Sequence, residues 1–125
     1  MKVTKNTNSD RKKANKVAIK EISTLRQKEV ISGFKGRFLH AEKFTIAFWE
    51  IEKGSVLPEH KHIHEQTTQV VEGTLEMTIG NETSLLKPGM IAHIPSNIKH
   101  SGKALTNCKL TDTFCPARVD YKFDS

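Results

Sequence analysis

The sequence predicts an all-β domain, a sandwich or a barrel of about seven or eight short strands. Apolar and polar residues alternate in short runs from residue 44 onward, the pattern of strands with one buried face. Gly, Pro and Asn interrupt these runs about every 8–12 residues. No segment shows a convincing helical period of any length. At 125 residues, the chain has the length of one domain with a short tail.

The segments before residue 60 predict two elements. Residues 17–26, VAIKEISTLR, show no clear period, so we expect an edge strand or an irregular lead-in. Residues 44–54, FTIAFWEIEKG, alternate clearly and predict a strand that ends at a Lys53-Gly54 turn. Phe48 and Trp49 fall on opposite faces of this strand, so one of them fills the core and the other faces outward.

The rest of the chain predicts a further series of short strands. They cover residues 60–73, 74–80, 83–89 (after a Gly80-Asn81 hairpin turn), 90–95 and a final pair of strands through 108–116. In the segment TLEMTIG, we expect Leu75, Met77 and Ile79 to face inward. The segment MIAHIP stops at Pro95, which lacks the N–H that a strand ladder needs.

The net charge of +6 is concentrated at the N-terminus. Residues 1–20 contain seven Lys or Arg and one Asp, whereas residues 21–125 contain thirteen basic and thirteen acidic residues. We therefore expect a basic, flexible, solubilising arm over residues 1–20 and a single domain over residues 21–125, because the arm has too few apolar residues to order itself. No recognition-helix pattern or RNA-binding signature accompanies the arm, so no nucleic-acid partner is expected.

The sequence also argues against a membrane protein, a secreted protein and a protein built on disulfides or a zinc knuckle. No run of about 18 apolar residues exists, and the N-terminal segment lacks the apolar stretch of a signal peptide. We therefore expect no membrane partner and a cytoplasmic location. Cys108 and Cys115 are seven residues apart with no second pair, which argues against a disulfide framework or a zinc knuckle.

The histidines are the first candidates for chemistry. His60 and His62 lie in the segment HKHIHEQ, and on a strand two such residues share a face about 7 Å apart. Two imidazoles so placed can bind one metal ion, although an isolated His-x-His is more often a feature of the surface. Neighbouring strands would have to supply the other ligands, for which Gln66 offers an oxygen and His100 another imidazole.

The residues around these histidines resemble the two signatures of the cupin family. The first is matched by Gly54, five residues, His60, one residue, His62, three residues, Gln66, six residues and Gly73. The second is matched by Gly89, five residues, Pro95, one residue, Asn97, two residues and His100. The departures are Gln66 for the usual Glu, Asn97 for Gly and Ala104 for Asn. The match covers about residues 44–116.

This resemblance implies a small single-domain cupin, a jelly-roll barrel with a metal near its mouth. The implied ligands are His60, His62, Gln66 and His100, and the implied cofactor is one divalent transition metal. Ni, Zn, Mn, Fe and Co all remain open, because this donor set tolerates each of them. Gln in place of Glu leaves the bound cation with one more positive charge, which favours Lewis-acid chemistry and capture of an anionic substrate.

The other histidines have weaker claims to a role. We expect His64 to be a surface residue, with a contact to a ligand or to the substrate as the alternative. We expect His93 to be in the core or in a pocket wall rather than bound to metal. His40 precedes the barrel strands, and no role is expected for it.

The C-terminal segment, LTDTFCPARVDYKF, holds the second group of candidates. Asp112 and Phe114 share a strand face, and Arg118 follows Pro116 in a turn. An inward Asp and Arg beside an aromatic ring suit a sugar acid, since Arg forks onto a carboxylate and Asp can move protons. A surface Asp112–Arg118 salt bridge with Phe114 in the core is the alternative.

Together, the segments HEQ, IPSNIKHSGKAL and D-x-F-x-x-x-R resemble the KdgF-type pectin-degradation cupins. That resemblance implies an enzyme that converts 4,5-unsaturated uronates, released by polysaccharide lyases, into linear keto-uronates. The implied catalytic residues are Asp112 as general acid and base, Arg118 as carboxylate clamp, and Phe114. Cys115, where Ser is common, and the basic arm are departures.

Two other functions remain open beside this one. The chain would be either a non-catalytic cupin that binds sugar or metal, or an iron-type cupin dioxygenase. The expected partner is a small-molecule sugar acid. The resemblance to small cupins also implies a homodimer through the outer strands, which would cover exposed sheet edges.

Overall fold

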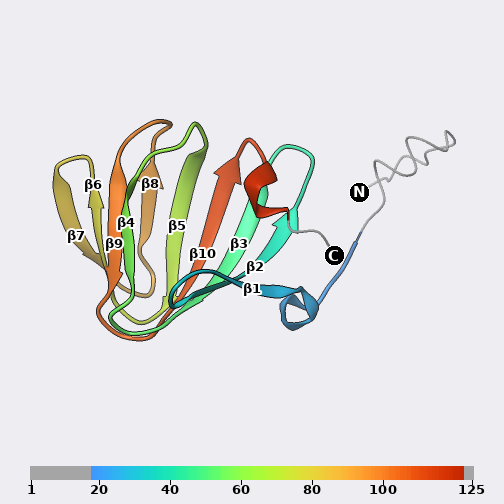
Figure 1. Ribbon diagram of the computed structural model, residues 1–125, viewed down its shortest axis with the longest axis horizontal. Coiled ribbons are helices and arrows are strands. Elements are labelled where there is room, and N and C mark those ends of the chain that lie inside the picture. Colours follow the sequence, from blue (N-terminus) through green and yellow to red (C-terminus); the bar gives the residue numbers. More distant parts are fainter. Residues whose placement is uncertain (1–17, 123–125) are drawn as a thin grey trace, which may run out of the picture.

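The structure is a computed structural model that describes residues 18–122. Residues 1–17, most of the predicted basic arm, lie outside the described residues. Within the described range the chain forms ten strands and two short 3-10 turns (Figure 1). They are η1 (Ile22–Thr24), β1 (Gln27–Ile31), β2 (Phe34–His40), β3 (Thr45–Ile51), β4 (Val56–His60), β5 (Glu65–Glu72), β6 (Leu75–Ile79), β7 (Glu82–Leu86), β8 (Ile91–Ile94), β9 (His100–Ala104), β10 (Cys108–Cys115) and η2 (Val119–Tyr121).

The strands form two antiparallel sheets. One sheet has six strands in the order β1-β2-β3-β10-β5-β8, and the other has four in the order β4-β9-β6-β7. No hydrogen-bonded strand pair among the described residues joins the two sheets, so they form a β-sandwich rather than a closed ring. The predicted all-β fold is confirmed. Both helical elements in the described range are three-residue turns, and neither is long enough or apolar enough to cross a membrane.

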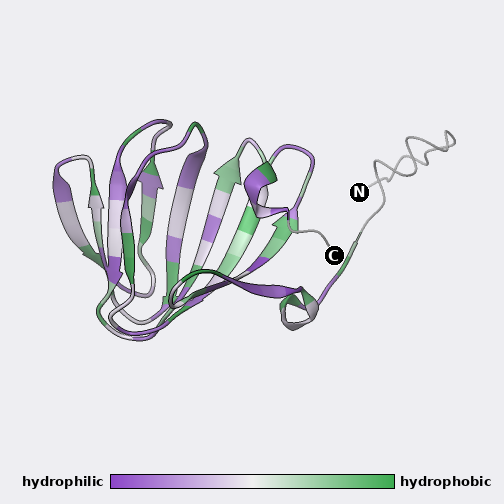
Figure 2. Cartoon of the chain, in the orientation of Figure 1, coloured by the Kyte–Doolittle hydropathy of each residue, from purple (hydrophilic) through white to green (hydrophobic). Residues whose placement is uncertain are grey.

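The core lies between the sheets, and strict alternation along the strands builds it. In β3, Thr45, Ala47, Trp49 and Ile51 are buried, while Phe48 between them is only partly covered. Trp49 is therefore the ring that fills the core. Leu75 and Met77 of β6 are buried as expected. Figure 2 shows the resulting hydrophobic and hydrophilic bands along the strands.

The predicted strand region over residues 60–73 is two strands separated by a corner. β4 ends at His60, and β5 begins at Glu65. β4 pairs with β9 in the four-stranded sheet, whereas β5 pairs with β10 and β8 in the six-stranded sheet. Residues 61–64 thus carry the chain from one sheet to the other. His60 and Gln66 consequently project from opposite walls of the sandwich.

The lead-in over residues 18–26 is irregular apart from η1, which agrees with one of the two expectations for it. The side chain of Arg37 in β2 holds this segment in place. Its Nη1 donates to the carbonyl oxygen of Ser23 at 3.1 Å and also to that of Leu25. The lead-in is therefore fixed at the six-stranded sheet before β1 begins.

Candidate metal centre

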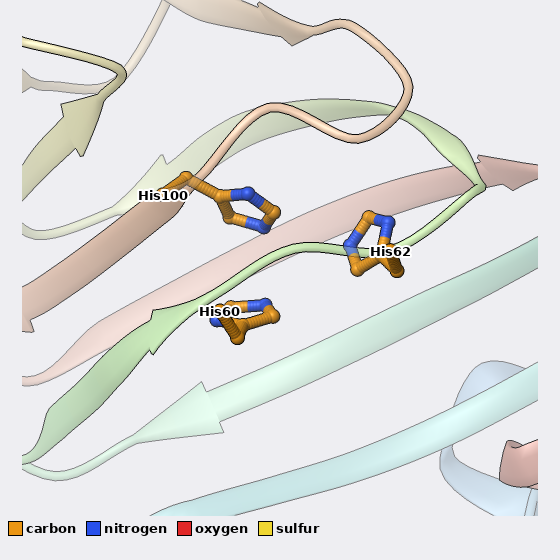
Figure 3. Close-up of side chains that lie close together, drawn as sticks. All are labelled: His60, His62 and His100. Atoms are coloured by element: carbon orange, nitrogen blue, oxygen red, sulfur yellow. The ribbon is translucent and has the colours of Figure 1, made fainter.

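Three histidine rings from the four-stranded sheet and the adjoining loop converge. His60 ends β4, His62 lies in the loop after it, and His100 begins β9 opposite His60. The ring centroid of His100 is 4.1 Å from that of His60 and 4.9 Å from that of His62. One nitrogen of each ring lies within 4.8 Å of the others (Figure 3). His60 and His62 meet because the chain turns at the corner, and not because they alternate along one strand as the sequence suggested.

A hydrogen bond between two loops holds His62 in place. The backbone N–H of Asn97, in the loop between β8 and β9, donates to the carbonyl oxygen of His62 at 2.8 Å. Asn97 has φ of 62°, a left-handed conformation that Asn tolerates better than most residues. This explains physically why Asn can stand where the cupin signature usually has Gly.

Each of the three rings has a fixed tautomer. Nδ1 of His60, His62 and His100 lies 2.9 Å from a backbone carbonyl oxygen. The three acceptors are the carbonyls of Pro58, His64 and Ile98, respectively. A carbonyl can only accept, so each Nδ1 carries a proton and Nε2 is the ring nitrogen available to a metal. This is the arrangement that metal-binding histidines require.

The cluster fits a metal ion in its charge as well as its geometry. Nε2 of His100 is buried and has no hydrogen-bond partner among residues 18–122, which a cation at this position would supply. Burial, opposed by the hydrogen bond to the Ile98 carbonyl and reinforced by Arg118 and the neighbouring histidines, lowers the pKa of His100 to about 4. Burial also lowers the pKa of His62. Both rings are therefore neutral at pH 7, as ligands must be.

Gln66 approaches the same cluster from the other sheet. Its Nε2 donates to the hydroxyl of Thr68 at 2.9 Å, which leaves Oε1 facing Nε2 of His62 at 3.0 Å. With the tautomer described above, these two atoms are both acceptors, so a shared cation would satisfy both. Gln66 is 5% exposed. The four predicted ligands therefore lie together, with His60 and His100 on the four-stranded sheet, His62 in the corner loop and Gln66 on the six-stranded sheet.

A cavity of about 130 Å³ extends inward from His60 and His62. Its polar residues are His60, His62, Gln66, Thr68, Asp112 and Arg118, and most of the remaining lining is apolar. A cavity of about 150 Å³ holds one benzene ring, so the enclosed part of this space is no larger than one six-membered ring needs. Phe114 also lines it, so all three predicted catalytic residues face one space beside the predicted ligands.

Asp112 occupies the centre of the six-stranded sheet, between Ala47 and Thr68 on the flanking strands. Its Oδ2 accepts a 3.0 Å hydrogen bond from Nε1 of Trp49, while its Oδ1 has no partner among the described residues. Burial raises the pKa of Asp112 to about 6, although hydrogen bonds from Thr68 and Trp49 oppose the rise. A carboxyl group with this pKa can hold or release a proton near neutral pH.

Arg118 is buried but fully paired along one edge. Its Nε and Nη2 donate to the two carboxylate oxygens of Asp120 at 2.9 and 2.6 Å. Its Cζ lies 4.7 Å from the ring centroid of Phe114 and 4.1 Å from that of Tyr121. Burial opposes the charge, but Asp120 and Tyr121 outweigh it and raise the pKa of Arg118. The alternative of a surface Asp112–Arg118 salt bridge is wrong, because Arg118 pairs with Asp120. Its other half is confirmed, because Phe114 is buried in the hydrophobic core.

Two further histidines can be placed against their predictions. His64 is half-buried, and its ring centroid lies 5.4 Å from that of His62. Its carbonyl oxygen, not its ring, orients a predicted ligand. The expectation of a core or pocket-lining His93 is wrong, because this side chain is exposed and pairs with Glu65 at 2.6 Å. The buried residue of β8 is Ile94, so His93 faces outward.

Sequence reasoning missed Asp120 and Tyr121. Both belong to η2, a turn of only three residues with no periodic signal. The one available signal was the spacing Arg-x-Asp in ARVDY, which allows a local ion pair once the chain turns back.

Comparisons with known proteins agree with this geometry. The family model described as "Cupin domain" matches residues 47–114. The curated "Pectin degradation protein KdgF" of Dickeya dadantii (strain 3937) is 37% identical over 71 residues, which cover 55% of this chain and 64% of that protein. The match thus spans less than two thirds of that relative.

Two solved structures are similar over most of their length. An RmlC-like cupin from Shewanella frigidimarina NCIMB 400 has a TM-score of 0.77 at 26% identity, and the match covers 80% of this chain and 91% of that one. KdgF from Halomonas sp. has a TM-score of 0.74 at 26% identity, and the match covers 78% and 91% of the two chains. The similarity therefore includes both sheets of the sandwich.

Proposed function

The chain belongs to the cupin family, and from this premise we propose that it is a metal-dependent enzyme that converts 4,5-unsaturated uronates into linear keto-uronates. The two KdgF relatives support a role in the degradation of pectin or a related uronan. The expected substrate is a small sugar acid.

One observation carries the proposal. Three of the four proposed metal ligands (His60, His62 and Gln66), a buried carboxyl group and a buried guanidinium all line a single small cavity. Burying a guanidinium or a carboxyl group is costly. A pocket for a neutral, apolar ligand would need neither group. The combination suits a substrate that carries a carboxylate and gains or loses a proton.

The chain's own residues account for the steps of the reaction. Arg118 would bind the substrate carboxylate, and the ring of Phe114 would pack against the sugar ring. Asp112 would deliver a proton to C4 of the enol ether, and water would add at C5 and return a proton to the Asp112 carboxylate. The hemiketal would then open by breaking the bond between C5 and the ring oxygen, and the C5 hydroxyl proton would pass to that oxygen. C5 becomes the ketone, and C1 is left as a hydrated aldehyde that loses water to give the linear keto-uronate.

A divalent ion held by His60, His62, Gln66 and His100 would polarise oxygen atoms of the substrate. The cavity would hold the sugar ring beside Asp112, so the reacting carbon and the proton donor would already be close together and correctly oriented. The hydrogen bond from Trp49 to Oδ2 would prevent rotation of the Asp112 carboxyl group.

The proposal is tested by adding the metal-loaded protein to unsaturated galacturonate from a pectin lyase digest. Loss of the ultraviolet absorbance of the conjugated double bond reports the reaction directly. We expect Asp112→Asn to lower kcat at least 100-fold, the usual contribution of a positioned proton donor. Glu72→Gln, which removes a charge at the far end of β5, serves as the matched control.

The alternatives give different results in the same assay. A binding protein would leave the absorbance unchanged but would show saturable binding of the uronate by calorimetry. A dioxygenase would consume oxygen with an added substrate, whereas the proposed hydration proceeds equally well without air. Native-rate turnover by the Asp112→Asn variant would show that the proton comes from another group.

A further inference from the structure

The guanidinium of Arg118 has one closed edge. Nε and Nη2 together form the side edge of the fork, and Asp120 occupies both positions with hydrogen bonds of 2.9 and 2.6 Å. A guanidinium offers five N–H groups, so the pairing with Asp120 leaves the two on Nη1 and one on Nη2. One N–H of Nη1 and the remaining N–H of Nη2 form the end edge of the fork, and the side chain of Tyr121 also hydrogen-bonds the guanidinium.

Aromatic rings lie against the guanidinium as well. Its Cζ is 4.7 Å from the ring centroid of Phe114 and 4.1 Å from that of Tyr121. Such contacts restrict rotation of the planar group and favour its charged form. With these rings against it and Asp120 on its side edge, the orientation of Arg118 is fixed by three neighbours.

Asp120 acts from outside the cavity. Arg118, Phe114 and Tyr121 line the cavity, whereas Asp120 does not belong to its wall. The side chain of Arg118 is 9% exposed and that of Asp120 is 53% exposed. A ligand in the cavity therefore meets the guanidinium and not the carboxylate that holds it.

We propose that Asp120 is a positioning residue that closes the side edge of Arg118 and presents the end edge to a carboxylate ligand in the cavity. The inference rests on the proposed function, in which that ligand is a uronate. It explains how a cationic site can select a planar carboxylate in one orientation, since a bidentate pair is directional where a bare charge is not.

The test is calorimetric binding of galacturonate, which has no double bond to react, to the metal-loaded protein. The proposal expects Asp120→Asn to weaken binding about tenfold, because the amide keeps the shape but offers one acceptor in place of two. Asp120→Glu should restore part of the affinity. Glu72→Gln removes the same charge away from the cavity and should bind like the wild type.

Arg118 also provides a readout that does not depend on the ligand. We expect its Nε–H to give a slowly exchanging nitrogen-15 NMR signal in the wild type and to lose that signal in Asp120→Asn. A merely structural role would lower the midpoint of thermal unfolding without selectively reducing the affinity for galacturonate.

Several results would overturn the inference. Tighter binding by Asp120→Asn would show that Asp120 competes with the ligand for the positive charge. An unchanged affinity in Asp120→Asn, or a wild type that does not bind galacturonate, would contradict the proposed positioning of Arg118 for a carboxylate ligand. Failure of the proposed function gives a different pattern. The wild type would bind galacturonate and Asp120→Asn would bind it more weakly, but the wild type would not convert unsaturated galacturonate.

Discussion

Trp49 and Asp112 form a buried hydrogen bond across the six-stranded sheet, from the indole Nε1–H to the carboxylate Oδ2, at 3.0 Å. The two residues sit on the adjacent strands β3 and β10, and both side chains point into the sandwich. Gly36 on β2 makes room for the indole, since a Cβ there would lie 2.7 Å from a ring carbon of Trp49. The packing of the core thus orients the proposed proton donor.

The first prediction follows from that bond. Trp49→Phe removes the N–H donor, which is one of the groups that lower the pKa of Asp112. The pKa of Asp112 should therefore rise above about 6, and the corresponding limb of the pH–rate profile should move to higher pH. The profile of kcat/KM for unsaturated galacturonate measures the shift.

A change in packing alone must be separated from this effect. Phe34 packs edge-on against Trp49 with ring centroids 6.3 Å apart but has no polar atom near Asp112. Phe34→Leu should lower the midpoint of thermal unfolding and leave the limb in place. Equal shifts in the two variants would show that the hydrogen bond does not set the pKa.

The second prediction concerns acid stability of the metal-free protein. Between about pH 4 and pH 6, His100 is neutral when folded and protonated when unfolded, so its contribution to stability falls as pH falls. Asp112 behaves in the opposite way, because its pKa is raised from 3.8 to about 6 and the folded state holds the proton. The two contributions therefore offset each other in this window.

Asp112→Asn removes one of these opposing contributions. Each proton changes the free energy of unfolding by about 1.4 kcal/mol per pH unit. We expect this variant to lose stability about 1 kcal/mol per pH unit more steeply than the wild type between pH 6 and pH 4. Urea unfolding at several pH values measures the slopes, and parallel slopes would contradict the assignment.

The strands that could be predicted from the sequence are those with one buried face. Trp49 and Met77 belong to strands whose alternation is visible in the sequence. β1 and β2 were not predicted, because β1 is an edge strand with a single neighbour and little burial. β9 reads HSGKA and contains no large apolar residue, so only its position between β4 and β6 makes it a strand.

The same limit applies to the site. His60 and His62 are close in sequence, but His100 lies far along the chain, so only the resemblance to the two cupin signatures joined the three into one predicted metal site. The contact between Arg118 and Asp120 needs the η2 turn, whose conformation is set by packing rather than by any local pattern. A residue such as Asp120, which orients another residue of the site, is therefore harder to predict from sequence than the proposed metal ligands.

The third prediction tests the histidine cluster with metal alone. Added Zn²⁺ or Ni²⁺ should raise the midpoint of thermal unfolding of the wild type, because a ligand that binds only the folded state stabilises it. His100→Ala should abolish the rise, since it removes the buried Nε2 that lacks another partner. The exposed His93 provides the control, and His93→Ala should respond like the wild type. A full response from His100→Ala would place the ion elsewhere.

The fourth prediction addresses Gln66, the one predicted ligand on the six-stranded sheet. Gln66→Glu introduces a carboxylate 3.0 Å from the position of the His62 nitrogen, so the attraction for a divalent cation should increase. We expect metal affinity to rise at least tenfold, which corresponds to about 1.4 kcal/mol.

The same substitution should harm the capture of an anion. The added negative charge cancels one positive charge of the site, so KM for unsaturated galacturonate should rise while the metal is held more tightly. Metal titration by calorimetry and steady-state kinetics at saturating metal measure the two effects separately. Gln69→Glu, on the exposed face of the same strand, adds an equal charge and should change neither value. If Gln66→Glu left both values unchanged, the side chain of Gln66 would lie outside the metal's coordination.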